Sequence, residues 1–282
     1  VAVSGSGPYT YTMTCDRAIP AAWGAGAKMY IGDGITFPGF VTGADSAIKD
    51  RLLMNNSAVG DCFGGSVPIN LEMKSGHTES VSAQIRVHTG TLTATKGMVV
   101  VRGAAGAAVR PVITSTLNGK CFLLQQFCRV EGFNIVGNAG ASQVGISCQA
   151  ATLNFRHVEI VNMDISNVNT GVDYTNGNTG VLIADSYIHD LSPGTTYGIS
   201  HNGWAIEVRN TVVKGCSNGF YSTFSSASTV VQLVDSAFVS CTSHGIWLNS
   251  TSSTVVPNNY PCWRIEGCTV ASNGGDGLRL SA

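Results

Sequence analysis

Charged residues are scarce in this sequence: they make up 12% of the chain, about half the share of an average soluble protein. The 16 Lys and Arg residues against 17 Asp and Glu residues leave a formal net charge of -1. This balance excludes a basic protein that binds nucleic acid by neutralising phosphates. No apolar run reaches the roughly 18–20 residues of a membrane-spanning helix. The first residues also lack the basic start and apolar run of a secretory signal.

Cysteine pairs of the C-x-x-C type are absent although the chain has 9 cysteines, so their spacing indicates neither a zinc knuckle nor a thioredoxin-type site. An odd number of cysteines cannot all pair within one chain. We expect mostly reduced thiols that serve as small apolar core residues, as in proteins made in a reducing cytosol. Long helix-forming runs are rare beside 34 glycines, which makes a helical bundle or coiled coil a poor fit.

The second half of the sequence contains an internal repeat. Six segments share an aliphatic first residue, a Gly, Asn or Asp two positions later, and an apolar residue five positions after the first; they start at Val130, Ile160, Ile183, Val208, Leu233 and Ile265. Their starts are 30, 23, 25, 25 and 32 residues apart, which is typical of a solenoid with insertions of variable length. β-Branched residues at a spacing of two indicate that the coils are built of strands.

Stacking such coils predicts columns of equivalent residues. The Gly/Asn/Asp position is predicted to bend the chain between two strands with a positive φ, which these residue types tolerate best; its members are Gly132, Asn162, Asp185, Asn210, Asp235 and Gly267. Eight positions after each aliphatic start, an inward column is predicted from Val168, Leu191, Cys216 and Cys241. We interpret its two cysteines as packing residues, and a disulfide between adjacent coils stays open as the alternative.

The sequence of the first half predicts an irregular N-terminal arm, a capping helix and further strands. Residues 1–43 show little periodicity and are predicted to be an irregular N-terminal arm. Residues 44–54 predict a short amphipathic helix, because a capping residue precedes apolar residues that share one helix face. Such a helix suits the open end of a solenoid, which exposes apolar core and unpaired strand edges. Residues 44–282 are predicted to form one β-helix domain whose coils are clearest over 130–282.

Three stretches of the first half carry a resemblance to known proteins. The helical ADSAIKDRLL run, the sequence GHTES at Gly76–Ser80 and the sequence RPVIT at Arg110–Thr114 precede the coils. Together they resemble right-handed parallel β-helix proteins of the pectin-lyase-like superfamily, and more narrowly β-helix proteins encoded among the structural genes of tailed bacteriophages. The resemblance covers about residues 44–282. It implies an all-β fold, a right-handed parallel β-helix (solenoid) with a short N-terminal capping helix, but not one function, because that fold carries lyases, hydrolases, tailspikes and passive virion proteins.

The catalytic motifs of enzymes in that superfamily are missing. Polygalacturonase-like members carry Asn-Thr-Asp, Asp-Asp, Gly-His-Gly and Arg-Ile-Lys motifs, and the nearest fragment here is Ser243-His244-Gly245. The best carboxylate pair is Asp185 with Asp235, which two coil spacings separate by ~10 Å, near the ~6.5–9.5 Å of an inverting glycosidase. Because the turn column itself favours Asp and Asn, we predict no catalytic residue, and this pair is the alternative.

The other polar and aromatic candidates favour structural roles. His189 beside Asp190, and also His201, are expected on or beside loops, and His77 and Glu79 alternate along a strand as surface residues do. No metal-ligand spacing and no phosphate-binding loop is present, so neither a metal nor a cofactor is predicted. The aromatic residues of the second half either pack in seams and core or stack on sugars: Trp204, Tyr221, Phe224 and Trp247.

Two classes of function remain. The first is a non-catalytic virion protein of a tailed phage, a β-helix that decorates or cements the capsid exterior. It would assemble in the host cytoplasm as a homotrimer on the major capsid protein, with residues 1–43 and the insertion at 251–262 as contact arms. The second is a tailspike that binds or depolymerises host surface polysaccharide, as a glycoside hydrolase or polysaccharide lyase. A free pectate-lyase-like enzyme is a minor third hypothesis, and neither nucleic acid nor a membrane is an expected partner.

Overall fold

The computed structural model describes fourteen stretches of the chain: 2–4, 10–12, 36–38, 69–73, 75–82, 84–87, 99–104, 106–124, 128–148, 157–175, 180–191, 196–224, 229–250 and 262–281. Every regular element in these stretches is a β-strand. A search of them for a helix long and apolar enough to cross a membrane finds none. The predicted capping helix at 44–54 and the insertion up to residue 261 lie outside the described residues.

The chain divides into two compact units, Val1–Ile31 and Gly32–Ala282. In the first unit, β1 (Ala2–Ser4) pairs antiparallel with β2 (Thr10–Thr12). The second unit contains the remaining strands. Its first strand, β3 (Thr36–Pro38), falls in the segment predicted as an arm and pairs in parallel with β4.

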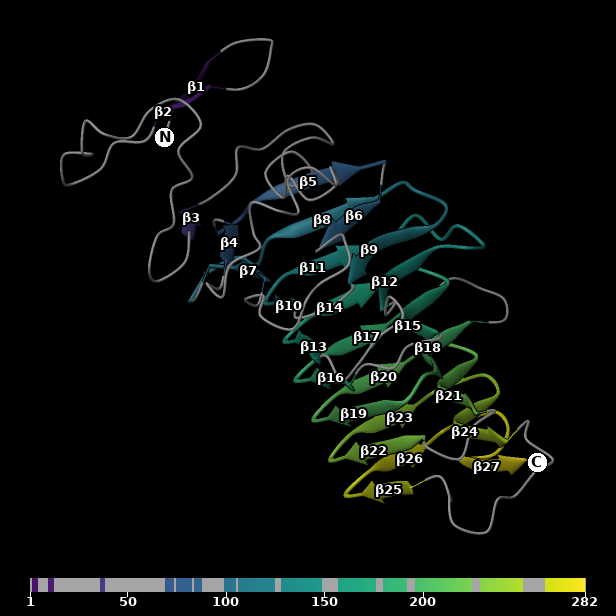
Figure 1. Cartoon of the computed structure of the whole chain (residues 1–282). Helices are drawn as coiled ribbons and strands as arrows, with labels where there is room; N and C mark the ends of the chain where they lie inside the picture. Colours follow the sequence, from purple (N-terminus) through teal and green to yellow (C-terminus); the bar gives the residue numbers. More distant parts are fainter. Residues whose placement is uncertain are drawn as a thin grey trace. The chain divides into compact units, whose positions relative to one another are not determined.

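Three parallel sheets build the second unit, and each coil contributes one strand to each sheet in turn (Figure 1). The first sheet consists of β3, β4 (Ile69–Met73), β7 (Val99–Gly103), β10 (Cys128–Glu131), β13 (His157–Val161), β16 (Gly180–Ala184), β19 (Ala205–Arg209), β22 (Val230–Val234) and β25 (Cys262–Glu266). The second consists of β5 (Thr78–Val81), β8 (Val112–Ser115), β11 (Asn134–Val136), β14 (Asp164–Ser166), β17 (Tyr187–His189), β20 (Val212–Lys214), β23 (Ala237–Val239) and β26 (Thr269–Ala271). The third consists of β6 (Ile85–Val87), β9 (Lys120–Leu124), β12 (Val144–Cys148), β15 (Thr170–Thr175), β18 (Tyr197–Asn202), β21 (Asn218–Phe224), β24 (His244–Ser250) and β27 (Leu278–Ser281).

The coils stack in register, so that each inward residue lies on its counterpart in the next coil. In the first sheet, for example, Ile160 pairs with Ile183, and Ile183 pairs with Val208. The inward columns of the second and third sheets are buried to 0% exposure and contain Ile113, Ile135, Ile165, Ile188, Val213 and Phe238, and Phe122, Ile146, Val172, Ile199, Phe220 and Ile246. Each such side chain contributes about 1.5–3 kcal/mol on burial. The predicted all-β parallel β-helix is confirmed.

The turn between the first and second sheets also agrees with the sequence pattern. All six residues of the predicted turn column have a positive φ, between 45° and 73°: Gly132, Asn162, Asp185, Asn210, Asp235 and Gly267. The predicted inward column is buried as well, with exposures from 0% at Val168 to 8% at Leu191. The residue types of these two columns therefore follow from backbone geometry and packing.

One prediction about polar residues is wrong. His77 and Glu79, expected at the surface, are only 2% and 4% exposed, and His77 Nε2 lies 3.2 Å from Glu79 Oε2. Glu79 pairs with the buried Ile113 of the next coil. The strand alternates as predicted, but the face that carries His77 and Glu79 is the buried one. His201, expected on or beside a loop, is the next-to-last residue of β18 and has 0% exposure, so it lies beside a turn but in the core. Alternation determines which residues share a face of the strand. Which of the two faces is buried depends on contacts with the neighbouring coils.

Stacked glycines bring the coils close together near the start of the third-sheet strands. A Cβ atom added to Gly171 would lie 2.6 Å from the carbonyl oxygen of Gly198, and one added to Gly198 would lie 2.6 Å from that of Gly219. Real Cβ atoms do not approach a backbone oxygen so closely, and the oxygen belongs to a hydrogen-bonded strand that cannot move alone. Glycine is required here by the approach of two backbones rather than by φ.

We expect Gly198→Ala to lower the free energy of unfolding by about 1–3 kcal/mol, because overpacking forces the two coils apart. Guanidinium unfolding followed by circular dichroism measures this change. Gly180→Ala is the matched control, because a Cβ atom there meets nothing closer than 3.9 Å. Equal stability of the two variants would contradict the close approach of the coils.

Candidate functional site

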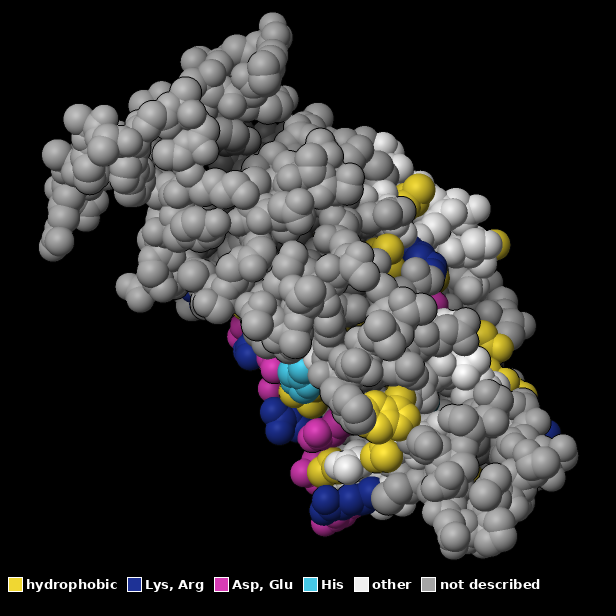
Figure 2. Space-filling view, in the orientation of Figure 1, with side chains coloured by type: hydrophobic (Ala, Val, Ile, Leu, Met, Phe, Trp, Pro, Cys, Tyr) yellow, Lys and Arg dark blue, Asp and Glu magenta, His cyan; other side chains and the backbone are white. Residues whose placement is uncertain are grey.

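Charged side chains of both signs gather in one strip along the face shown in Figure 2. This strip follows the outward face of the first sheet, where β4, β7, β10 and β13 carry acidic and basic residues opposite one another. In-register strands place such residues about 4.8 Å apart, within reach of cross-strand ion pairs. We therefore consider this face of the first sheet first as a candidate binding or catalytic site.

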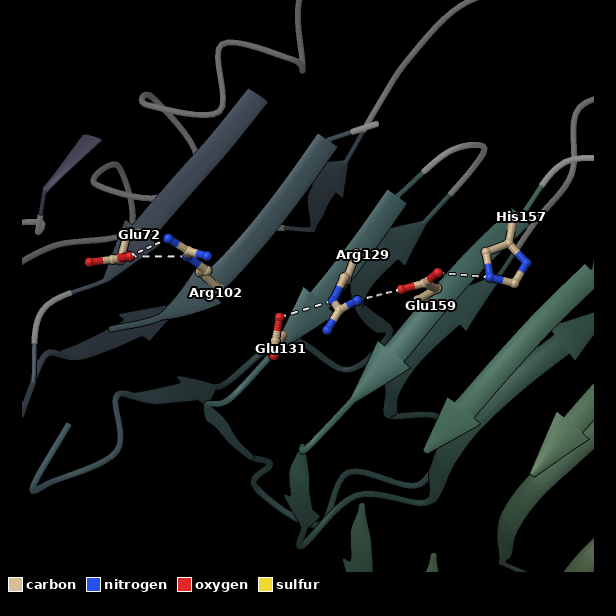
Figure 3. A network of polar contacts seen from close by, with 6 residues as sticks. All are labelled: Glu72, Arg102, Arg129, Glu131, His157 and Glu159. Carbon is tan, nitrogen blue, oxygen red and sulfur yellow. Dashed lines mark hydrogen bonds and ion pairs between the residues drawn. The ribbon is translucent and has the colours of Figure 1, made fainter. Parts of the chain in front are cut away.

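Figure 3 shows that these charges pair with one another. Arg102 Nη2 lies 2.9 Å from Glu72 Oε2, across two neighbouring strands. Arg129 bridges two carboxylates, with Nε 2.9 Å from Glu131 Oε2 and Nη1 2.8 Å from Glu159 Oε2. His157 Nε2 then lies 2.9 Å from the second oxygen of Glu159, so the network ends on an imidazole.

The electrostatics of Arg129 reflect this network. Burial alone would lower its pKa, but hydrogen bonds and charges from Glu131 and Glu159 outweigh burial and raise the pKa above its usual value. Arg129 therefore stays cationic and holds both carboxylates in place. Its side chain is 32% exposed, so solvent screens the pairs and each contributes about 1 kcal/mol or less.

A shallow groove lies beside the end of this network. Its volume is about 210 Å³, and its floor is made by small or apolar residues at the starts of three successive strands: Gly180, Ala205 and Val230. His157, Glu207 and Gln232 supply its polar rim. An imidazole, a carboxylate and an amide around a small floor provide hydrogen-bond donors and acceptors for a polar ligand.

The two candidate catalytic carboxylates do not line this groove. Asp185 and Asp235 follow the last residues of β16 and β22, whereas the groove lies at the first residues of the same strands. The nearest lining residues, Leu182 and Gln232, come three residues before the two aspartates, so ~10 Å of extended strand separates them. Asn210, between the two aspartates in the turn column, donates a hydrogen bond from Nδ2 to Asp185 Oδ1 at 2.7 Å. The sequence thus identified the turn column but not the groove.

His189 is held between two carboxylates. Its Nδ1 lies 2.8 Å from Asp190 Oδ2, and its Nε2 lies 3.0 Å from Asp164 Oδ1. The ring of Tyr187 stacks on the imidazole with a centroid distance of 4.0 Å. Both ring nitrogens are engaged within the protein, so neither is directed at a substrate.

The aromatic side chains of the third sheet stack on each other rather than present open faces. Tyr197 and Tyr221 have centroids 5.0 Å apart at 25°, and Tyr221 and Trp247 have centroids 4.7 Å apart at 55°. The guanidinium of Arg279 lies 5.0 Å from the Trp247 ring centre. A sugar stacks on a free ring face, so this column favours the packing interpretation for Tyr221 and Trp247. The side chain of Phe224 lies outside the described residues.

Two groups in the core are chemically distinctive. His201 Nδ1 lies 2.8 Å from Ser222 Oγ, while its Nε2 has no hydrogen-bond partner in the described part of the chain. Burial lowers the pKa of His201 to about 3, so the ring is neutral inside the protein.

The sulfur atoms of Cys216 and Cys241 lie 3.6 Å apart. Over the described residues, no group of three or more His, Cys, Asp or Glu side chains is arranged to hold a metal ion.

Part of the chain matches a known protein family. Residues 129–282, more than half of the chain, match the family model described as "Periplasmic copper-binding protein (NosD)". No curated protein matches the chain. A solved structure described as ORF18 of Geobacillus virus E2 is similar, with a TM-score of 0.45 and 11% sequence identity. The alignment covers 89% of this chain and 60% of the viral chain.

We expect His201 to make the protein sensitive to acid. Its pKa is about 3 in the folded state and about 6.5 in an unfolded chain, so the unfolded state binds the proton more readily between these values. The stability is complete above pH 6.5 and falls by about 1.4 kcal/mol per pH unit as the pH decreases towards 3. Guanidinium unfolding at pH 6.5, 5.5 and 4.5 measures this slope.

Carboxylates add their own pH dependence, so the slope is compared with that of His201→Leu. Leucine already occupies the same inward column at Leu248, which pairs with Ser222. The variant is expected to lose stability more slowly on acidification than the parent. Parallel slopes for the two proteins would show that His201 takes no part.

Proposed function

We propose that this chain, which belongs to the NosD family of parallel β-helix proteins, is a non-catalytic structural protein that decorates or cements the capsid exterior of a tailed phage. In this proposal the β-helix acts as a rigid body that holds flat sheet faces against a protein lattice. Copies associate as a homotrimer and bind the major capsid protein on the virion surface. The function lies in the faces of the solenoid rather than in a reactive centre.

The observation that supports this proposal is the way in which outward side chains bind each other from coil to coil. Arg129 joins Glu131 to Glu159 on the first sheet. On the third sheet, Tyr221 stacks on Tyr197 and contacts the tilted ring of Trp247. Catalysis needs polar groups that converge on one reacting atom. Side chains arranged in columns instead hold successive coils together. A rigid surface that contacts other proteins requires such support.

The second sheet offers a face suited to association between copies. Its outward positions near the C-terminal end carry Val212, which is 37% exposed, Ala237, Val239 and Ala271, with Lys214 and Thr269 between them. Small apolar side chains on a flat sheet pack well against a second such face. A closed symmetric trimer would bury this flank in each copy. The phage origin is supported by the resemblance of the Gly76–Ser80 and Arg110–Thr114 sequences to β-helix proteins of phage structural genes.

Copper, which the description of the family names, does not fit the described residues. Blue-copper centres combine two imidazoles with a thiolate and a weak axial ligand. The pair Cys216 and Cys241 supplies two sulfur atoms, but no third His, Cys, Asp or Glu side chain completes such a set within the described stretches. No part of the proposed function therefore depends on copper.

The location and the copy number of the chain on purified virions test the proposal. Electron cryo-microscopy of purified virions is expected to show the β-helix in a regular lattice over the head, in hundreds of copies and in groups of three. Quantitative mass spectrometry of the same particles, with the major capsid protein as the internal reference, gives the copy number independently. Absence from virions would overturn the proposal, and density at the tail alone would favour a tailspike.

The second candidate function is glycan binding by a tailspike, and the groove on the first sheet favours it. A volume of about 210 Å³ with His157, Glu207 and Gln232 at its rim suits the hydroxyl groups of a sugar. Cleavage would require the Asp185–Asp235 pair, which lies away from the groove, so binding without cleavage is the form of this function that the geometry favours.

A tailspike predicts binding to at least one of a panel of bacterial surface polysaccharides, measured by isothermal titration calorimetry. Ala205→Phe fills the groove floor and is expected to weaken that binding at least about tenfold, a loss of about 1.4 kcal/mol. Ser200→Phe, at a half-buried outward position of the third sheet, is the matched control and should leave it unchanged. Release of reducing ends that is lost in Asp185→Asn and Asp235→Asn would show cleavage. No binding by the parent protein would exclude this function.

A further inference from the structure

The cysteines Cys216 and Cys241 occupy equivalent positions on two successive coils. Lys214 of β20 pairs with Val239 of β23, and each cysteine follows its strand by two residues, so the register places the two opposite each other. The backbone continues this pairing, because Thr242 N donates a hydrogen bond to Cys216 O at 2.8 Å. Parallel neighbours about 4.8 Å apart fall within the 4.4–6.8 Å Cα separation of disulfide-bonded cysteines.

The two side chains also point at each other. Their sulfur atoms are 3.6 Å apart, and the side chains are 3% and 1% exposed. Both thiols lie in the inward column that also contains Val168 and Leu191. A small movement of the two Sγ atoms, without a change of the backbone register, suffices to bring them to bonding distance.

We propose that Cys216 and Cys241 are a site of covalent modification, at which an oxidising environment forms a disulfide that links the coil of β19–β21 to the coil of β22–β24. The oxidant is a low-molecular-weight disulfide such as oxidised glutathione. One cysteine thiolate attacks the glutathione disulfide and releases one glutathione thiolate. The second cysteine thiolate attacks the mixed disulfide and releases the other. Two protons and two electrons leave the protein, and the glutathione disulfide is reduced to two thiols.

The environment of the pair favours Cys241 as the first thiolate. The hydrogen bond from the Cys216 thiol, with backbone N–H groups of Cys216 and Gly219, lowers the pKa of Cys241 despite its burial. Since the thiolate is the nucleophile in disulfide exchange, Cys241 attacks first and Cys216 closes the bond. Burial of both sulfurs means that the exchange takes place while the coils stack during folding or open transiently.

A linkage between residues 25 positions apart restrains the unfolded chain and holds two coils together. The midpoint of thermal unfolding is expected to rise by roughly 5–10 °C on oxidation. Addition of a reductant should reverse the rise. This inference concerns the chain in any oxidising medium and stands whether or not the protein is part of a virion.

The experiment refolds the full chain in a buffer of oxidised and reduced glutathione, blocks free thiols, and digests with a protease that cleaves before aspartate. Cleavage at Asp190, Asp235 and Asp276 separates the two cysteines: fragment 190–234 contains Cys216 as its one cysteine, and fragment 235–275 contains Cys241 with Cys262 and Cys268. We expect the two fragments to appear as one linked species that separates on reduction. Tandem mass spectrometry then assigns the bond to Cys241.

The variants Cys216→Ala and Cys241→Ala are the matched controls, and each should abolish both the linked species and the rise of the unfolding midpoint. The parent chain secreted into the periplasm of a bacterial host, and analysed without refolding, gives a second measurement that does not depend on the variants. Separate fragments in both preparations of the parent would overturn the proposal. A linked species that persists in Cys241→Ala would also overturn it, because Cys262 or Cys268 would then hold the bond.

Discussion

The structure depends on the stacking of each coil directly on the one before it. Backbone hydrogen bonds between coils fix the register, so that Ile160 lies on Ile183 and Ile183 on Val208. Each inward residue therefore packs against the residue at the same position of the next coil, and one coil alone has no closed core. The positive φ of the turn column and the close approach of Gly171 and Gly198 follow from this same constraint.

The outward side chains obey the constraint as well. Residues that share a position in successive coils lie within contact of one another, which accounts for the Arg129 network and the Tyr197–Tyr221–Trp247 column. Polar and aromatic groups that elsewhere mark reactive centres here stabilise the solenoid. This arrangement is why we favour a structural function, in which flat and rigid faces meet partners, over catalysis.

The candidate groove illustrates what a sequence pattern cannot reveal. Gly180, Ala205 and Val230 are unremarkable residues in the sequence, and each begins a strand after a loop of different length. They form one floor only because three strands start in register, and His157 joins them from a fourth strand. The repeat aligns these three residues, because each lies three positions before an aliphatic start, but Gly, Ala and Val at an outward position give no sign of a groove.

The sequence by itself determined the all-β coil, the turn column and the inward aliphatic columns, because each is a local requirement that recurs in every coil. A bend needs Gly, Asn or Asp, and a buried strand face needs aliphatic residues at a spacing of two. The repeat also predicted that Cys216 and Cys241 share one inward column, as the structure shows. Only the tertiary structure decided which face of the His77–Glu79 strand is buried and how deeply His201 lies in the core. These depend on which coil stacks on which and in what register, and that is set by contacts between residues far apart in the sequence.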